Sequence, residues 1–91
     1  MYSIEFTNQY LKDLKLARKR NFDELKLNDI IKILISGERL PARYKDHALS
    51  SKLKGLNECH ISPDWLLIYE KNEIIRLVTL VRTGTHSDLF N

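Results

Sequence analysis

Residues 65–82 read WLLIYEKNEIIRLVTLVR and contain most of the apolar residues of the C-terminal half. Two apolar runs, 65–70 and 74–82, flank Lys71-Asn72, a pair that favours a tight reversal of the chain. In both runs apolar residues occupy consecutive positions, so each predicted strand is apolar on both faces. The second run includes Ile75. The pattern therefore predicts two adjacent antiparallel strands in the middle of a sheet, covered by helices on at least one side.

The sequence on either side supplies the remaining elements. Residues 56–61 predict a third strand, joined to the first by a turn at Ser62-Pro63-Asp64. Near the N-terminus, residues 2–6 alternate like a strand, and a helix follows to about Lys19. Asn21 and Glu24 resemble a capping box for a second helix that ends before Gly37. We expect an α+β fold of order β-α-α-β-β-β, with two N-terminal helices packed on a mainly antiparallel four-stranded sheet.

Two segments are less regular. Residues 37–51 show no sustained period and predict a long connection, and residues 85–90 are expected to form one helical turn. Length favours a single domain over residues 1–91. The sequence has no apolar stretch long enough to span a membrane and no secretory signal pattern. We therefore expect neither a membrane span nor export. With Cys59 as the one cysteine, no internal disulfide can form, so we expect a cytoplasmic protein.

Charge favours an anionic partner without requiring one. The net charge is +3, and the excess of basic residues lies in residues 1–46. Lys12, Lys15 and Lys19, with Arg18 nearby, predict a basic stripe on the first helix. This stripe is expected either to follow a phosphate backbone or to be an ordinary solvated helix face.

The three histidines all lie in the second half, each beside a turn signal or an acid. Glu58 and His60 are two residues apart on a strand, so their side chains leave the same face about 7 Å apart. The three predicted strands, joined by short turns, would allow further groups to reach the end of the sheet that carries Glu58 and His60. These groups are His47, Asp64, Arg82 and His86.

Histidine, carboxylate and arginine are the side chains that metal-free RNA cleavage requires. The reaction needs a base for the 2′-OH proton, an acid for the departing 5′-oxygen and a cation for the charge on phosphorus. No HExxH, paired-cysteine or His-x-His spacing indicates a metal, so we expect no metal and no other cofactor. Each histidine can also be a surface residue without a role.

Other candidates divide between packing and binding. Cys59 lies between Glu58 and His60 and is expected to point into the core, and Trp65 is expected to pack there too. Phe90 lies in a polar tail. It is expected either to stack on a nucleobase or to dock the tail onto the body.

Three ordered motifs now resemble a known family. They are residues 44–49 (YKDHAL), 54–69 (KGLNECHISPDWLLIY) and 82–90 (RTGTHSDLF). Together with Tyr10-Leu11-Lys12-Asp13 they are similar to the YafQ branch of the RelE toxin superfamily over nearly the whole chain. The resemblance implies a RelE-like α+β fold and a toxin of a type II toxin-antitoxin module. Such toxins cleave translated mRNA in the ribosomal A site, which inhibits translation and arrests growth.

The resemblance also implies roles for individual residues. The family's catalytic histidines match His47, His60 and His86, and its turn aspartate, arginine and terminal aromatic match Asp64, Arg82 and Phe90. The acidic position two before the middle histidine is often Asp in the family, whereas this chain has the longer Glu58. Implied partners are a cognate antitoxin, the ribosome and mRNA, with operator DNA contacted only through the antitoxin complex.

From these residues we predict cleavage by 2′-OH attack. His60 or Glu58 is expected to act as base and His86 as acid, although the two labels can exchange. Arg82 is expected to stabilise the phosphorane, and His47 and Asp64 to orient groups or share protons. Two rival hypotheses are a gyrase-directed toxin of the ParE kind and an RNA-binding module without catalysis.

Overall fold

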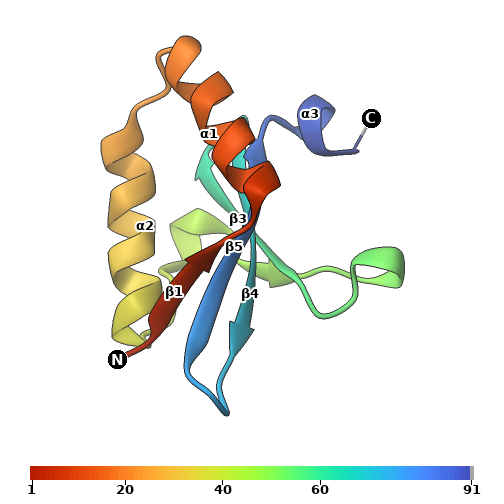
Figure 1. The fold of residues 1–91 in the computed structure, drawn as a ribbon. Coiled ribbons are helices and arrows are strands. Elements are labelled where there is room, and N and C mark those ends of the chain that lie inside the picture. The colour runs from red at the N-terminus through yellow and green to blue at the C-terminus, as the bar shows by residue number, and fades with distance from the viewer. Residues whose placement is uncertain (91) are drawn as a thin grey trace.

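The computed structural model describes residues 1–90 as one five-stranded sheet with two long helices packed against it (Figure 1). The strands are β1 (Ser3–Phe6), β2 (His47–Ala48), β3 (Asn57–Ser62), β4 (Trp65–Asn72) and β5 (Leu77–Gly84). The helices are α1 (Asn8–Lys19), α2 (Glu24–Ser36), the short 3-10 turns η1 (Ala42–Tyr44) and η2 (Ser51–Leu53), and α3 (His86–Phe90). The predicted α+β class is confirmed.

The sheet has the order β1-β5-β4-β3-β2. Strands β3, β4 and β5 pair antiparallel, as predicted; β2 also pairs antiparallel with β3, whereas β1 pairs parallel with β5. Between β1 and β5 the chain passes through both helices to the far edge of the sheet and then returns through β2, β3 and β4, so that β5 runs parallel to β1. Strands β4 and β5 are interior strands, which explains why they are apolar on both faces.

The two N-terminal helices begin and end where local chemistry predicts. The Thr7 side chain accepts a hydrogen bond from the backbone N–H of Tyr10 and so caps α1. The predicted capping box at Asn21 is wrong: Asn21 adopts φ +60°, and Asp23 caps α2 instead. Gly37, with φ +83°, ends α2 in the left-handed conformation that glycine tolerates.

Two expectations about the sheet are corrected. The predicted sheet had four strands, but β2, only two residues long, adds a fifth within the connection over residues 37–51. A strand was expected from Ile74, but β5 begins at Leu77, and Ile74 and Ile75 lie exposed in the turn. Asn72 explains the difference, because its side chain accepts hydrogen bonds from the backbone of both isoleucines and closes the turn.

The core lies between the helices and one face of the sheet. It contains Leu14 of α1, Ile30 of α2, Leu67 of β4 and Leu80 of β5. Cys59 and Trp65 belong to the same cluster, so their predicted burial is confirmed. Because neighbours on a strand alternate between faces, Leu66 and Ile68 of β4 are buried on the opposite face.

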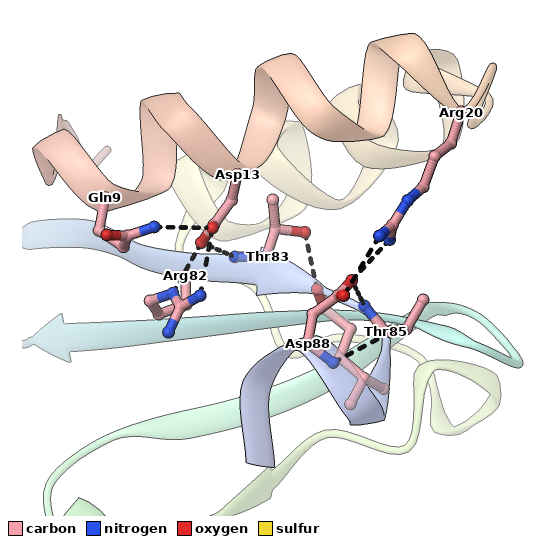
Figure 2. Close-up of polar contacts among 8 residues, drawn as sticks. Gln9, Asp13, Arg20, Arg82, Thr83, Thr85 and Asp88 are labelled. Atoms are coloured by element: carbon pink, nitrogen blue, oxygen red, sulfur yellow. Dashed lines mark hydrogen bonds and ion pairs between the residues drawn. The ribbon is translucent and has the colours of Figure 1, made fainter. Parts of the chain in front are cut away.

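Two ionic contacts join the segment of α1 and its C-cap to the C-terminal part of the chain, one to β5 and one to α3 (Figure 2). Asp13 accepts hydrogen bonds from Nε and Nη2 of Arg82, at 2.7 and 3.2 Å, and from the backbone N–H of Thr83. Arg20 pairs with Asp88, which also accepts from the backbone N–H of Thr85. These contacts fix the start of α3 over β5.

Gly84 allows this close approach. A Cβ at Gly84 would lie 3.0 Å from Cβ of Asp88, so a larger residue would push α3 away from the strand. The position of α3 therefore depends on a residue without a side chain as well as on the ion pair.

We predict that Asp13→Asn lowers the free energy of unfolding at pH 7 by about 2 kcal/mol, the usual value for hydrogen bonds to a charged group. Burial opposes ionisation of Asp13, but hydrogen bonds from Arg82, Gln9 and Thr83 outweigh it and lower its pKa. A lowered folded pKa gives stability that is present above the unfolded value of about 4 and is lost as pH falls below it. Urea unfolding between pH 3 and 7 measures both effects.

The variant should therefore lose less stability on acidification than the wild type. Glu73→Gln is the control, because Glu73 lies in the exposed β4–β5 turn and has no ion pair within residues 1–90. Equal acid sensitivity of wild type and Asp13→Asn would contradict the assigned contact.

Candidate active site

A carboxylate and two imidazoles meet at one edge of the sheet. Oε1 of Glu58 lies 3.4 Å from Nε2 of His47 and 4.0 Å from Nε2 of His60. Glu58 is 7% exposed, whereas the two histidines remain open to solvent. A buried carboxylate thus lies between two accessible rings.

Strand geometry explains this meeting. His47 of β2 pairs directly with Glu58 of β3, and directly paired residues place their side chains on the same face. His60, two residues further along β3, points to that face as well. Cys59 between them is fully buried in the core, which places Glu58 and His60 on the face away from the helices.

The segment that carries His47 is fixed by hydrogen bonds. The hydroxyl of Tyr69 donates to Oδ1 of Asp46 at 2.6 Å, which joins this loop to the central strand. Nδ1 of His47 lies 2.8 Å from the backbone carbonyl of Lys45. Since a carbonyl only accepts, Nδ1 carries the proton and Nε2 is the nitrogen available to Glu58.

Burial has a strong effect on two neighbouring groups. Burial, reinforced by the hydrogen bond to Asp46, raises the pKa of the Tyr69 phenol. Burial likewise raises the pKa of the Cys59 thiol, which argues for packing and against a nucleophilic role. Sequence reasoning gave Asp46 and Tyr69 no role, because residues 23 positions apart give no local signal of a contact.

The register of the sheet aligns further candidates with the cluster. Glu58 pairs with Ile68, which pairs with Arg82, and His60 pairs with Leu66, which pairs with Gly84. Arg82 therefore lies in the same cross-strand row as Glu58. Its Nε and Nη2 are engaged by Asp13, which leaves Nη1 without a hydrogen bond to any of residues 1–90.

Three predicted residues form no hydrogen bond or ion pair with the cluster within residues 1–90. His86 begins α3, two residues beyond Gly84, and its ring centroid is 5.0 Å from that of Phe90. Phe90 is 38% exposed. Asp64 lies in the β3–β4 turn, where its charge contributes to the raised pKa of Arg20 after the larger effect of Asp88.

The predicted basic stripe is present but separate. Lys12, Lys15 and Lys19 are exposed on the side of α1 that faces away from the core. Arg18 forms a two-bond ion pair with Glu24, at 2.8 and 2.9 Å, so its charge is compensated within the protein. The stripe and the histidine cluster belong to opposite sides of the sheet.

No helix among residues 1–90 is long and apolar enough to cross a membrane. Within the same residues, no group of three or more His, Cys, Asp or Glu side chains is arranged to hold a metal ion.

Comparison with known proteins gives the class of this chain. Residues 2–91 match the family described as bacterial toxin of type II toxin-antitoxin system, YafQ. The mRNA interferase toxin YafQ of Escherichia coli K12 is 47% identical over 88 residues, which cover 96% of this chain and 94% of the relative. The chain therefore belongs to the YafQ family of type II toxin-antitoxin toxins.

Solved structures agree with this assignment. The E. coli DinJ-YafQ complex contains a chain that matches with a TM-score of 0.91 and 44% identity over 100% of both chains. A metal-bound toxin from Helicobacter pylori matches with a TM-score of 0.91 and 40% identity, over 99% of this chain and 100% of that one. The predicted family and RelE-like fold are confirmed.

We predict that Tyr69→Phe lowers the free energy of unfolding by about 1 to 2 kcal/mol, because the change leaves Asp46 without its hydrogen-bond donor. Amide hydrogen exchange of the residues around His47 should accelerate more than exchange in α1 and α2. Tyr2→Phe is the matched control, since the Tyr2 hydroxyl makes no hydrogen bond within residues 1–90. Identical stability of the two variants would contradict the anchoring role.

Proposed function

We propose that this protein cleaves RNA with the side chains gathered around Glu58. The chain is an endoribonuclease toxin of a type II toxin-antitoxin module, an mRNA interferase that inhibits translation. Residues 1–91 form its single toxin domain. The observation that supports this proposal most strongly is the Glu58 carboxylate, buried and within 3.4 and 4.0 Å of the two imidazole nitrogens.

This arrangement suits proton transfer in the cleavage of RNA. The 2′-OH of the RNA is the nucleophile, so the protein has to accept its proton and return one to the departing 5′-oxygen. His60 or Glu58 is the base. The 4.0 Å between Oε1 of Glu58 and Nε2 of His60 is longer than a hydrogen bond, so a proton passes between them through one bridging water. His47, with its Nδ1 proton directed at Lys45, orients or shares the proton through Nε2.

Arg82 and His86 complete the mechanism. Arg82 lies in the same row of the sheet as Glu58 and has Nη1 free to donate to a phosphate oxygen, which stabilises the charge of the phosphorane. Asp13 raises the pKa of Arg82 mainly by its hydrogen bonds, so the guanidinium stays charged. His86, just beyond the end of β5, is the acid that protonates the leaving 5′-oxygen.

The remaining predicted residues bind or position the substrate. Phe90, against the ring of His86, stacks on a nucleobase, and Asp64 orients groups at the β3–β4 turn. Lys12, Lys15 and Lys19 attract RNA or ribosome at longer range, with Arg18 contributing less because Glu24 already pairs with it.

The partners follow from the family. A cognate antitoxin binds and silences the toxin; the E. coli relative has been solved in a DinJ-YafQ complex. The substrate is mRNA on the ribosome in the cytoplasm, and operator DNA is contacted only through the antitoxin complex. Mapping the 5′ ends of transcripts after brief induction tests the activity, and growth arrest with intact mRNA would contradict it and favour a gyrase-directed toxin.

We predict that His86→Ala slows cleavage of mRNA on programmed ribosomes by about 10² to 10⁴-fold, the usual loss when a proton donor is removed. Ser87→Ala, on the same short helix, is the control and should cleave at the wild-type rate. A wild-type rate for His86→Ala would remove this histidine from the mechanism.

A chelator separates proton-transfer chemistry from metal-dependent cleavage. Because acid and base groups are all supplied by side chains, we predict that a chelator selective for transition metals, which leaves the Mg²⁺ of the ribosome in place, does not change the cleavage rate. The metal-bound state of the H. pylori toxin makes this test informative. A loss of activity that zinc or copper restores would contradict the metal-free mechanism.

A further inference from the structure

A cleft of about 420 Å³ opens beside the candidate active site and has no role in the mechanism above. It lies between α2, the segment around η1 and the C-terminal end of β3. Its volume falls in the range of about 300 to 1,000 Å³ that is typical of sites for small organic ligands. His60 lines the cleft and its side chain lies 4.0 Å from Glu58, so the cleft and the active site adjoin at this residue, on either side of the edge of the sheet.

The charges of the cleft favour an anion. Lys26, Arg43 and Lys45 line it, and none of them forms an ion pair with a carboxylate of residues 1–90. One carboxylate, Asp29, lies among them, a single helical turn from Lys26. Three cations around one acid leave a net positive cleft, which complements a phosphate.

Arg43 is held in place before any ligand binds. Its Nη2 donates a hydrogen bond of 3.0 Å to the hydroxyl of Tyr44, and its guanidinium carbon lies 4.6 Å from the centroid of that ring. Tyr44 in turn packs partly against the core. A guanidinium held in this way offers a planar cationic surface, and nucleobases stack on arginine as well as on aromatic rings.

The edge of the sheet adds polar groups. Strand β2 pairs only with Asn57 and Glu58 of β3, so among residues 1–90 no strand lies along the outer edge of β3 from Cys59 to Ser62. Pro63 follows, and its ring adds an apolar wall. The cleft therefore combines cations, an apolar wall and an unpaired stretch of sheet edge, which together suit a base attached to a phosphate.

We propose that this cleft binds the nucleotide of the RNA next to the scissile phosphate. Lys26 and Lys45 bind its phosphate, its base lies against Arg43, and Asp29 accepts a hydrogen bond from an N–H of the base. His60 marks the boundary, with the scissile linkage on its other side. The inference rests on the proposed RNA cleavage and deepens it by placing the substrate.

The direct test measures binding of an uncleavable RNA, a fluorescent pentanucleotide with 2′-O-methyl groups throughout, to Lys26→Gln and Arg43→Gln. We expect each change to raise the dissociation constant about 5 to 10-fold. We also expect the slope of log affinity against log salt to become less steep by about 0.7 for each cation lost, the value for single strands. Lys32→Gln is the matched control, because Lys32 is exposed on the same helix but does not line the cleft.

A second arm separates this inference from the proposed catalysis. In steady-state cleavage the cleft variants should raise KM with little effect on kcat, whereas His60→Ala should lower kcat. Cleavage by the wild type together with a wild-type KM in the cleft variants would overturn the inference and leave the proposed function intact. Weakened RNA binding in the cleft variants with unchanged cleavage by His60→Ala would support the cleft as an RNA site and contradict the catalytic role of His60.

Two alternative occupants are distinguished by competition. A glutamate-rich peptide that binds the wild type, loses affinity in both cleft variants and does not displace the RNA would assign the cleft to an acidic protein segment and overturn the inference. If inorganic phosphate binds as tightly as the pentanucleotide, the cleft is a general anion site. That result would also overturn the inference. Circular dichroism of each variant confirms that the fold is retained.

Discussion

The structure depends on β4, whose residues from Trp65 to Tyr69 are buried on both faces. A strand with two apolar faces is stable only where both faces are buried, which is the interior of a sheet. Strands β3 and β5 therefore pair with β4 on either side. Its alternation also fixes the pairing register, because a shift by one residue would exchange the residues that face the helices with those that do not.

This register positions the candidate chemistry. Ile68 places Glu58 and Arg82 in one row, and Leu66 places His60 and Gly84 in the next. The active-site residues come from segments far apart in sequence, yet each is fixed by its relation to the same strand. Even His47, on the marginal two-residue strand β2, is connected to β4 through the Asp46–Tyr69 hydrogen bond.

Sequence reasoning predicted what local patterns encode. The apolar runs predicted β4 and β5, the helical spacing predicted α1 and α2, and the two-residue separation predicted that Glu58 and His60 share a face. The family motifs then gave roles to candidates such as His86, which the sequence pattern alone had placed only beside a turn.

Contacts distant in sequence could not be predicted in this way. The pair of Asp13 and Arg82 and the pair of Asp46 and Tyr69 are visible only after folding. Ile74 and Ile75 misled the strand prediction because hydrophobicity alone does not reveal that Asn72 closes a turn around them. The cleft beside His60 is formed by three separate segments, and the sequence of no single segment predicts it.

The central claim is that Glu58 and His60 act together on one proton. A double-mutant cycle tests it most directly, using single-turnover cleavage of ribosome-bound mRNA by Glu58→Gln, His60→Ala and the double variant. Residues that work as a unit give a double variant about as slow as the slower single variant. Losses that multiply, or a single variant that retains the wild-type rate, would contradict the account.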